Sequence, residues 1–457
     1  MELKDYIVSI DLGCSKVVAA LGALNEHGEV VVADFVSKPM SGFIRGEISN
    51  IELVTKALKS AVSELESRNN IIVSDVFVSV EGRHIVWADN SGFVYIGSDG
   101  EILEENVSQL CNNMNNVQAP DGMVILSRIP QRYKIDSRVV TADPVGMYGK
   151  QLGATYSFLL AGKGVLERIS KAFDRVGISG HKFHSAACAS AEVVASEDEK
   201  EMGVAVVDLG AGVTNVAIYH DNKLRYSVSI PVGQDAINKD IKAAAVPDKH
   251  IEKLKITHGY ATASAIPFNI LNSMIRIHGR TQHEKERFIP YRDLCTIIYA
   301  RMLDITDYVV EAIRTSGYQT QLGAGIILTG GGSQLHGVVE LFKDQTGQEV
   351  RLGIAEVGVG AESVEGCFDP SLATAIGLLA VGLKEGTVGG VKDAPQNSVE
   401  SKGGDTNKNG GNKDEEPEGK GGRGGKGSKG GWFSTLIGRI DKAIFGPDQE
   451  IVDDENM

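Results

Sequence analysis

One local pattern occurs twice in this chain and restricts the possible folds more than any other feature. An apolar run ends at an aspartate, a glycine-containing turn follows, and a second apolar run comes next; the copies occupy residues 6–21 and 203–219. A single copy would fit an ordinary hairpin turn. Glycine, however, lets the backbone approach a phosphate closely and direct its N–H groups toward it. Two copies therefore predict two similar lobes, each offering a phosphate loop across a shared cleft.

Two further segments support the same interpretation. Residues 324–339 combine an apolar strand, three successive glycines and a helix, and backbone exposed at such a junction often receives a nucleotide. Asp369 and Pro370 precede an apolar run of small residues at 372–383, which is typical of a helix start followed by a buried helix. A comparable run at 186–195 predicts a matching helix earlier in the chain.

Length and composition exclude several classes of protein. At 457 residues the chain is longer than one ordinary core requires, so two or more lobes are expected. The net charge of −14 argues against nucleic acid as a main partner. The scattered cysteines include no CxxC pair, so the sequence predicts neither a zinc site nor a disulfide framework. We expect no signal peptide, and no apolar run is long enough to span a bilayer.

Shifts in composition divide the chain into segments. Residues 84–164 contain several strand-like runs and one helical run, and predict a small α+β insertion. Residues 386–431 have hardly any apolar side chains, and we expect them to be disordered. The expected division is lobe 1 at 1–83, 165–197 and 361–385, lobe 2 at 198–230 and 301–360, insertions at 84–164 and 231–300, the linker at 386–431, a terminal helix at 432–446 and an acidic tail at 447–457.

The segment after the linker has the pattern of an amphipathic helix. At about 100° per residue, most of its large apolar side chains fall within about 140° of arc. A terminal helix often packs on its own domain, but behind a long tether a membrane-surface anchor or a ligand for a partner's groove fits better. Basic residues just upstream would favour anionic lipid, whereas the acidic end opposes it. The expected membrane-facing residues are Trp432, Phe433, Leu436, Ile437, Ile440 and Ile444.

The order of these segments resembles the actin, Hsp70 and sugar-kinase superfamily, and within it the FtsA family of bacterial cell-division proteins. IDLGCSK at 10–16 looks like that family's first phosphate loop, although Cys14 stands where a Thr is usual. IPQRYKIDSRVVTADPVGMYG at 129–149 looks like its special inserted subdomain, and the tethered helix is similar to its membrane-targeting sequence. The resemblance implies an α/β fold: an actin-like, two-lobed ATPase fold with an α+β insertion.

The resemblance also implies that ATP and Mg²⁺ bind between the lobes. Asp11 and Asp208 would face the magnesium ion, mostly through water, and Lys239 and Asp240 would contact adenosine or ribose. The other nucleotide-contacting residues that the resemblance implies are Gly13, Cys14, Ser15 and Lys16 in the first loop, Gly210, Gly212, Thr214 and Asn215 in the second, and Gly330, Gly331, Gly332 and Ser333 at the glycine-rich junction.

The implied role is that of a peripheral protein that polymerises at the cytoplasmic face of the inner membrane, at the division site. It would anchor filaments of FtsZ, the tubulin-like ring protein, and help to assemble the divisome at the septum. The implied partners are the C-terminal tail of FtsZ, further copies of the chain, anionic lipids and other division proteins, with no nucleic acid. Arg292 and Arg301 are the candidates for gripping the acidic tail.

We expect ATP turnover to be slow or absent, and the sequence predicts no catalytic residue. In hydrolysing relatives, a Glu or Gln on the helix before the second hairpin positions the attacking water. Residues 185–191 contain no such side chain, and the first carboxylate, Glu192, comes about a turn late. Cys14 also removes a potential hydroxyl contact.

Three other interpretations stay open at this stage. A sugar or acetate kinase of the same superfamily would need a catalytic Asp and polar groups for a second substrate, and would have no use for a tethered helix. A pilus-assembly adaptor would share the type of insertion but usually lacks the long tail. An Hsp70-like chaperone would need a β-rich peptide-binding domain where this chain has its linker.

Overall fold

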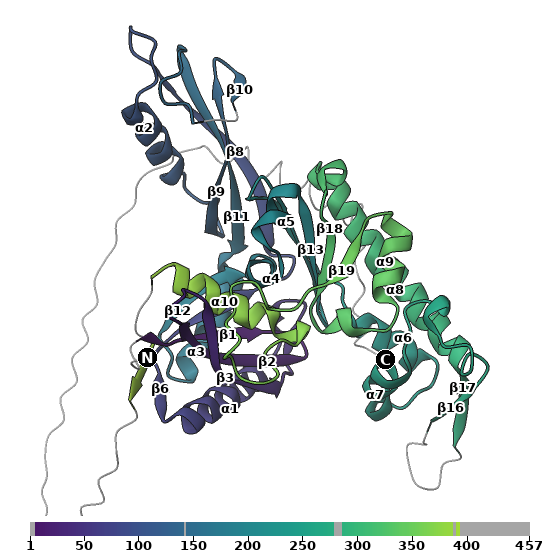
Figure 1. Cartoon of the computed structure of the whole chain (residues 1–457). Helices are drawn as coiled ribbons and strands as arrows, with labels where there is room; N and C mark the ends of the chain where they lie inside the picture. The colour runs from purple at the N-terminus through teal and green to yellow at the C-terminus, as the bar shows by residue number, and fades with distance from the viewer. Residues whose placement is uncertain (1–4, 141–142, 278–285, 387–389, 394–457) are drawn as a thin grey trace, which may run out of the picture.

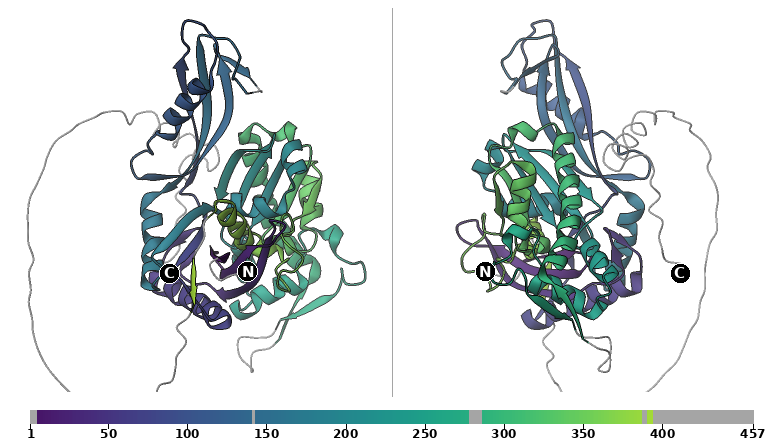
Figure 2. Two further views of the ribbon diagram at one scale, coloured as in Figure 1. Left: turned by 60° about the vertical axis from the view of Figure 1, so that its left-hand side comes forward. Right: turned by 90° about the vertical axis from the view of Figure 1, so that its right-hand side faces the viewer.

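The computed structural model describes residues 5–140, 143–277, 286–386 and 390–393. Over these ranges the chain forms two α/β lobes that lie against each other, and an elongated α+β subdomain that projects away from them (Figure 1). The two rotated views show the same projection from other sides (Figure 2). The predicted terminal helix at 432–446 lies outside the described residues.

Lobe 1 is built on a five-stranded sheet in the order β12-β7-β1-β2-β3. The strands are β1 (Ile7–Leu12), β2 (Lys16–Leu24), β3 (Val30–Pro39), β7 (Asp75–Val80) and β12 (Gly180–Ser185). The first three form antiparallel hairpins, while β7 and β12 run parallel to β1. The apolar runs on both sides of the first phosphate loop are almost completely buried, which is why they form central strands.

Lobe 2 repeats this arrangement in the order β15-β14-β13-β18-β19. Its strands are β13 (Val204–Leu209), β14 (Thr214–His220), β15 (Lys223–Ile230), β18 (Gly325–Thr329) and β19 (Val350–Leu352). Again the first three are antiparallel and the other two are parallel to the first. The prediction of two similar lobes, made from the duplicated hairpin, is confirmed.

Two buried helices, α4 (Ala186–Val194) and α10 (Ala373–Lys384), pack against each other where the lobes meet. A Cβ on Gly377 of α10 would lie 1.8 Å from the carbonyl oxygen of Ala189 in α4, so the two backbones approach more closely than any side chain would permit. Helix α10 packs on β1 and β2, and α4 packs on β13 and β14. Both helices predicted from small-residue runs are therefore present.

The remaining helices pack against the two sheets. In lobe 1, α1 (Ile51–Asn69) packs on β2 and β3 and on α3 (Lys163–Arg175), and the Asn50 side chain caps α1. In lobe 2, α8 (Tyr291–Ser316) contacts β14 and β15, and α9 (Val338–Thr346) contacts β19. Helix α8 is continuous across the expected boundary between residues 300 and 301.

The projecting subdomain carries its own hydrophobic core. It contains β8 (Ile85–Tyr95), α2 (Glu104–Asn115), β9 (Met123–Ile135), β10 (Arg138–Val140) and β11 (Gln151–Gly162), with the sheet order β10-β9-β11-β8. Strands β8 and β11 pair over eleven residue pairs and lead directly back to lobe 1. This is the α+β insertion predicted at 84–164.

A second, smaller subdomain extends from lobe 2. It contains α6 (Asp235–Ala243), α7 (Asp248–His258) and the short hairpin of β16 (Met274–Ile277) and β17 (Arg287–Pro290), and it packs on the start of α8. It corresponds to the helix-rich insertion predicted at 231–300.

Residues 390–393 correct the start of the predicted linker. The segment β20 (Val391–Asp393) pairs antiparallel with β6 (Ile71–Val73) on lobe 1. Val391 is buried there, and the Ser74 N–H donates to Gly390 O at 2.9 Å, so both burial and backbone pairing hold this short strand. Another short pair, β4 (Phe43–Ile44) and β5 (Glu47–Ile48), precedes α1. In the described ranges, no helix is both long and apolar enough to cross a bilayer.

Candidate functional site

The first phosphate loop joins β1 to β2. The Gly13 N–H donates to Lys16 O over 3.0 Å, and a Cβ on Gly13 would lie 2.9 Å from the same oxygen. Asp11 accepts a hydrogen bond from Ser79 Oγ at 2.7 Å, and that hydroxyl oxygen in turn accepts from the Leu12 N–H at 2.9 Å. Two neighbouring parallel strands therefore fix Asp11 at the carboxyl edge of the sheet, where α/β proteins commonly bind ligands.

The second phosphate loop has the same construction between β13 and β14. The Gly210 N–H donates to Val213 O over 3.0 Å, as Gly13 does in the first loop. Asp208 ends up buried and accepts a hydrogen bond from Thr374 Oγ1 of α10 at 3.1 Å. Gly330 lies against it with φ of +80°. The glycine-rich junction after β18 and the second loop therefore form one compact unit.

Lys16 and the two aspartates form the charged floor of the site. Lys16 Nζ donates to Ser371 Oγ at 2.6 Å. Burial lowers the pKa of Lys16, and the nearby charges of Asp11, Asp369 and Asp208 oppose that shift. Burial raises the pKa of Asp11, while burial together with the Asp11 charge raises the pKa of Asp208 to about 6. Two aspartates that are costly to ionise together are well suited to a bound cation.

A cavity of about 590 Å³ lies between the lobes, and all three glycine-containing segments reach it. The structure brings ten of the residues proposed for nucleotide binding to its wall. These are Asp11, Gly13, Cys14, Ser15, Lys16, Asp208, Gly210, Gly330, Gly331 and Gly332.

Other proposed residues lie behind the wall of the cavity. A Cβ on Gly212 would lie 2.6 Å from Cys14 Sγ, so this glycine marks the point where the two loops touch. Thr214 and Ser333 are buried and donate to backbone carbonyl oxygens at 2.8 and 2.7 Å. They brace the loops and do not face the cavity. Asn215 is also buried, at the contact described below.

The expectation for Lys239 and Asp240 is corrected by the structure. Asp240 accepts hydrogen bonds from Arg301 Nε and Nη2 at 2.7 and 3.1 Å, so it pairs with α8 and not with the cavity. Lys239 is exposed and lines a neighbouring cavity of about 620 Å³. Lys239 therefore lies on the far side of the loops from the 590 Å³ cavity, because the cavity that it lines is also bordered by Cys14 and Gly212.

Helix α7 provides the wall that the sequence analysis missed. Glu252, Lys255 and Ile256 line the cavity opposite the glycine-rich junction, together with Leu335 and His336. The Lys255 ammonium group is largely buried and lies 3.0 Å from Glu252 Oε2. A Glu and a Lys three positions apart lie on the same face of a helix. The sequence spacing could therefore have predicted that these two side chains point in the same direction.

Glu81 is a carboxylate of the cavity that the sequence analysis also missed. It follows β7, which runs parallel to β1, so it reaches the same sheet edge as Asp11. Its Oε2 accepts a hydrogen bond from Asn215 Nδ2 at 3.0 Å, and the Cys14 thiol donates to Oε1 over 3.8 Å. Burial, followed by the charge of Asp11, raises the pKa of Glu81 to about 8. One carboxylate therefore touches residues from both lobes.

Glu192, the first carboxylate of α4, lies outside the cavity. It pairs with Lys384, and its Oε2 lies 3.4 Å from Lys200 Nζ. Lys200 also pairs with Glu197 at 3.1 Å. Glu192 of α4 is therefore not among the residues that line the cavity.

The residues fit a polyphosphate and a divalent cation. At Gly13 and Gly330 a Cβ would collide with the loop itself, so the tight turns that border the cavity require glycine at both positions. Lys16 supplies positive charge, and Asp11 and Asp208 supply hard oxygen ligands. In the part of the chain that the structure describes, no group of three or more His, Cys, Asp or Glu side chains could hold a metal alone. Magnesium would therefore need phosphate oxygens and water as further ligands.

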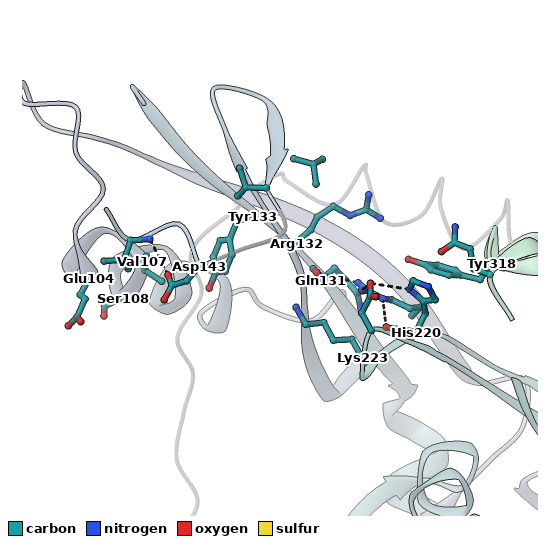
Figure 3. A pocket seen from close by; sticks show the side chains of 16 residues that line it. Glu104, Val107, Ser108, Gln131, Arg132, Tyr133, Asp143, His220, Lys223 and Tyr318 are labelled. Carbon is teal, nitrogen blue, oxygen red and sulfur yellow. Dashed lines mark hydrogen bonds and ion pairs between the residues drawn. The ribbon is translucent and has the colours of Figure 1, made fainter. Parts of the chain in front are cut away.

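A larger cavity, of about 1050 Å³, separates the outer part of the α+β insertion from lobe 2 (Figure 3). Glu104, Val107 and Tyr133 line its insertion side, and His220 and Tyr318 line the side of lobe 2. Side chains of both charges line it. The cavity shows that the outer half of the insertion stands clear of the lobes.

The inner half of the insertion is locked to lobe 2. Gln131 of β9 is buried, and its Nε2 donates to Leu224 O at 2.7 Å. Arg225 Nη1 donates back to Gln131 Oε1 at 2.9 Å. The rings of Trp87 and Tyr226 meet edge to face beside this contact, with centroids 6.1 Å apart. The insertion is thus joined covalently to lobe 1 and by side chains to lobe 2.

The two arginines proposed for partner binding differ in their surroundings. Arg292 is exposed in the first turn of α8. Arg301 is held by Asp240 and, through Nη1, by Asp304 at 3.0 Å. Its charge is therefore already compensated within the chain, which weakens its candidacy. Met274 and Phe288, on the neighbouring hairpin, are 54% and 57% exposed and leave an apolar surface near Arg292.

Both the family models and the curated relatives show that this chain is similar to FtsA proteins. Residues 205–377 match the family model described as cell division protein FtsA, and residues 82–159 match the SHS2 domain inserted in FtsA. The chain is 30% identical over 382 residues to the cell division protein FtsA of Neisseria meningitidis, covering 83% of this chain and 90% of that relative. It is 29% identical over 408 residues to the FtsA of Escherichia coli K12, covering 88% and 95%.

Among solved structures, the chain is similar in fold to the PilM-PilN type IV pilus biogenesis complex. The match has a TM-score of 0.57 and covers 82% of this chain and 98% of that chain, at 15% sequence identity. At that identity the likeness concerns the fold alone. The two-lobed, actin-like α/β fold implied by the sequence is therefore confirmed.

Proposed function

The chain belongs to the FtsA family of cell division proteins, and from that membership we propose that it is an ATP-binding scaffold that attaches the division ring to the membrane. The observation that carries the nucleotide site is the meeting of two equivalent phosphate loops at one cavity. Asp11 and Lys16 face it from lobe 1 and Asp208 from lobe 2.

ATP would lie with its phosphates between the two loops. The N–H groups of the tight turns and Lys16 would hold the β- and γ-phosphates. Asp11 and Asp208 would face the magnesium ion, mostly through water. The nucleoside would lie between the glycine-rich junction and α7, where Lys255 and Ile256 line the cavity. This replaces Lys239 and Asp240 as the proposed nucleoside contacts.

Turnover would be slow. No carboxylate of α4 reaches the cavity, and burial raises the pKa of Cys14 to about 12, so this residue is a neutral thiol where the family usually has a hydroxyl. A protein of this kind would use ATP mainly to hold its two lobes together, and not as a fuel consumed at every step.

Membrane attachment would be peripheral, through the amphipathic pattern at 432–446 on its tether. One such helix binds a membrane weakly, because its apolar area is small. Copies joined in a filament would bind strongly through their effective concentration. The proposed location is the cytoplasmic face of the inner membrane, at the division site.

The proposed partners are FtsZ, further copies of the chain and other division proteins. The acidic C-terminal tail of FtsZ would bind the smaller subdomain of lobe 2, where exposed Arg292 lies near the apolar surface of Met274 and Phe288. Filament contacts would involve the α+β insertion, whose outer surface exposes Phe93 and Tyr148.

Calorimetric titration of the full chain with ATP and Mg²⁺ tests the nucleotide site. Lys16→Ala should weaken binding by at least about tenfold, because a charged phosphate contact is worth roughly 1.5–3 kcal/mol. Lys239→Ala is the matched control, since it removes an equal charge from the neighbouring cavity, and it should bind as the wild type does. Equal binding by all three proteins would refute the proposed site.

A further inference from the structure

The acidic side chains of the cavity do not have equivalent surroundings. Asp11 and Asp208 end equivalent strands of the two lobes and are suited to a magnesium ion. Glu252 is paired with Lys255 on α7. Asp235 is exposed at the start of α6, whereas Glu81 lies between the two phosphate loops and contacts a residue from each lobe.

The position of Glu81 is fixed from several sides. Asn215 Oδ1 accepts a hydrogen bond from Ser229 Oγ, so the amide is held with its Nδ2 directed at Glu81 Oε2. The backbone is fixed as well: Gly46 has φ of +84°, and a Cβ there would lie 2.0 Å from Glu81 O. A carboxylate held this way loses little rotamer freedom when it acts on a bound group.

We propose that Glu81 is a catalytic residue of this site, whose carboxylate orients the water that attacks the γ-phosphate of bound ATP. The proposal rests on the ATP binding proposed above. The water oxygen forms a bond to the γ-phosphorus, and the bond from that phosphorus to the β–γ bridging oxygen breaks. The bridging oxygen keeps the electron pair and leaves as part of ADP. The proton of the water passes to Glu81 and then to solvent, which leaves ADP and inorganic phosphate.

Two features of the site favour Glu81 for this role. A base is most effective when its pKa lies near the working pH, and burial places the pKa of Glu81 at about 8. Its partners also span the cleft, with Cys14 in lobe 1 and Asn215 in lobe 2. Glu81 is therefore fully held only when the two phosphate loops are as close as they are here.

The test compares hydrolysis with binding in the full chain. Glu81→Gln keeps the shape and the oxygen that accepts from Asn215, but it cannot take a proton. Single-turnover hydrolysis of ATP should fall by at least about tenfold, as expected for loss of a general base. Affinity for a non-hydrolysable ATP analogue should change less than about threefold. Glu192→Gln is the matched control, because it alters a carboxylate that lies outside the cavity, and its hydrolysis should equal that of the wild type.

Three results would overturn the proposal. The first is hydrolysis by Glu81→Gln at the wild-type rate. The second is a wild-type protein that binds ATP and never hydrolyses it, which removes the catalytic role and leaves the binding site intact. The third is a wild-type protein that binds no ATP, which removes both. If Glu81→Gln does not fold, as judged by its thermal transition, Glu81→Ala decides by the same comparison.

Discussion

Gly330 in lobe 2 lies directly against the Asp208 carboxylate: a Cβ on Gly330 would be 2.1 Å from Asp208 Oδ1. Its φ of +80° is also a conformation that other residues rarely adopt. The glycine-rich junction is therefore needed by the fold of the second phosphate loop, whether or not a nucleotide is bound.

Gly330→Ala should destabilise the protein by at least about 2 kcal/mol and weaken ATP binding, because it adds a clash to a strained backbone. Gly317→Ala is the matched control. Gly317 has a similar φ of +77°, but its Cβ would meet open space. The Gly317→Ala substitution should lower the free energy of unfolding by only about 1 kcal/mol. Urea unfolding measures the stability of both variants. Equal losses of stability in the two variants would contradict the close contact between Gly330 and Asp208.

The fold followed from the sequence where local patterns repeat. Asp11 and Asp208 each end a buried strand before a glycine turn, and that duplication was sufficient to predict two equivalent lobes. The insertion was visible because strand-like runs at 84–164 interrupt the first lobe. The continuity of helix α8 (Tyr291–Ser316) across the expected boundary at 300–301 was not predicted.

The site was harder to predict wherever it depends on long-range packing. The loop glycines could be predicted from their spacing in the sequence. The contact between Glu81 and Asn215 could not, because it depends on the pairing of β7 with β1 and on the closure of the lobes. Lys239 was chosen on α6, whereas Lys255 on α7 reaches the cavity. The Glu252–Lys255 spacing predicts a pair on one helix face, but only the packing of the subdomain decides which lysine faces the cavity.

Gln131→Ala should destabilise the contact between the insertion and lobe 2. It leaves Leu224 O without its side-chain donor and removes one of the acceptors of Arg225 Nη1, at a cost of about 1–3 kcal/mol. Arg132→Ala, at the exposed neighbouring position, should change stability by less than about 0.5 kcal/mol. Denaturant unfolding measures the stability of both variants. If Gln131→Ala is as stable as Arg132→Ala, the contact between the insertion and lobe 2 does not stabilise the protein.

The stability of the nucleotide-free protein should depend on pH through Glu81. The pKa of Glu81 is raised from 4.5 to about 8 in the folded state, mainly by burial, with Asp11 and Asp208 adding charge repulsion. Between these values the folded state binds more protons than the unfolded chain, so the free energy of unfolding falls as pH rises. Glu81→Gln should be more stable than the wild type at pH ~8, and much less so at pH ~5. Thermal unfolding at both pH values measures the difference in stability between the two proteins. If that difference is the same at both pH values, the predicted role of Glu81 is contradicted.

Arg292→Glu should weaken binding of an acidic FtsZ tail peptide by about tenfold, because it replaces an exposed attractive charge with a repulsive one. Arg314→Glu, an equal change at the other end of α8, should leave the affinity unchanged. Arg301→Ala should mainly lower stability, since it removes the contact with Asp240. Peptide titration by fluorescence anisotropy separates these outcomes, and a loss of affinity with Arg314→Glu as large as with Arg292→Glu would refute a local binding site.

Co-sedimentation of the full chain with anionic vesicles, with and without ATP and Mg²⁺, tests the account as a whole most directly. The wild type should pellet with the vesicles, and more of it should pellet with ATP, because joined copies bind through effective concentration. Ile440→Glu places a charge on the apolar face predicted for residues 432–446 and should abolish pelleting, whereas Thr435→Glu, on the predicted polar face, should not. Pelleting of Ile440→Glu at the wild-type level, or a wild type that stays in the supernatant under all conditions, would contradict the proposed ATP-dependent membrane scaffold.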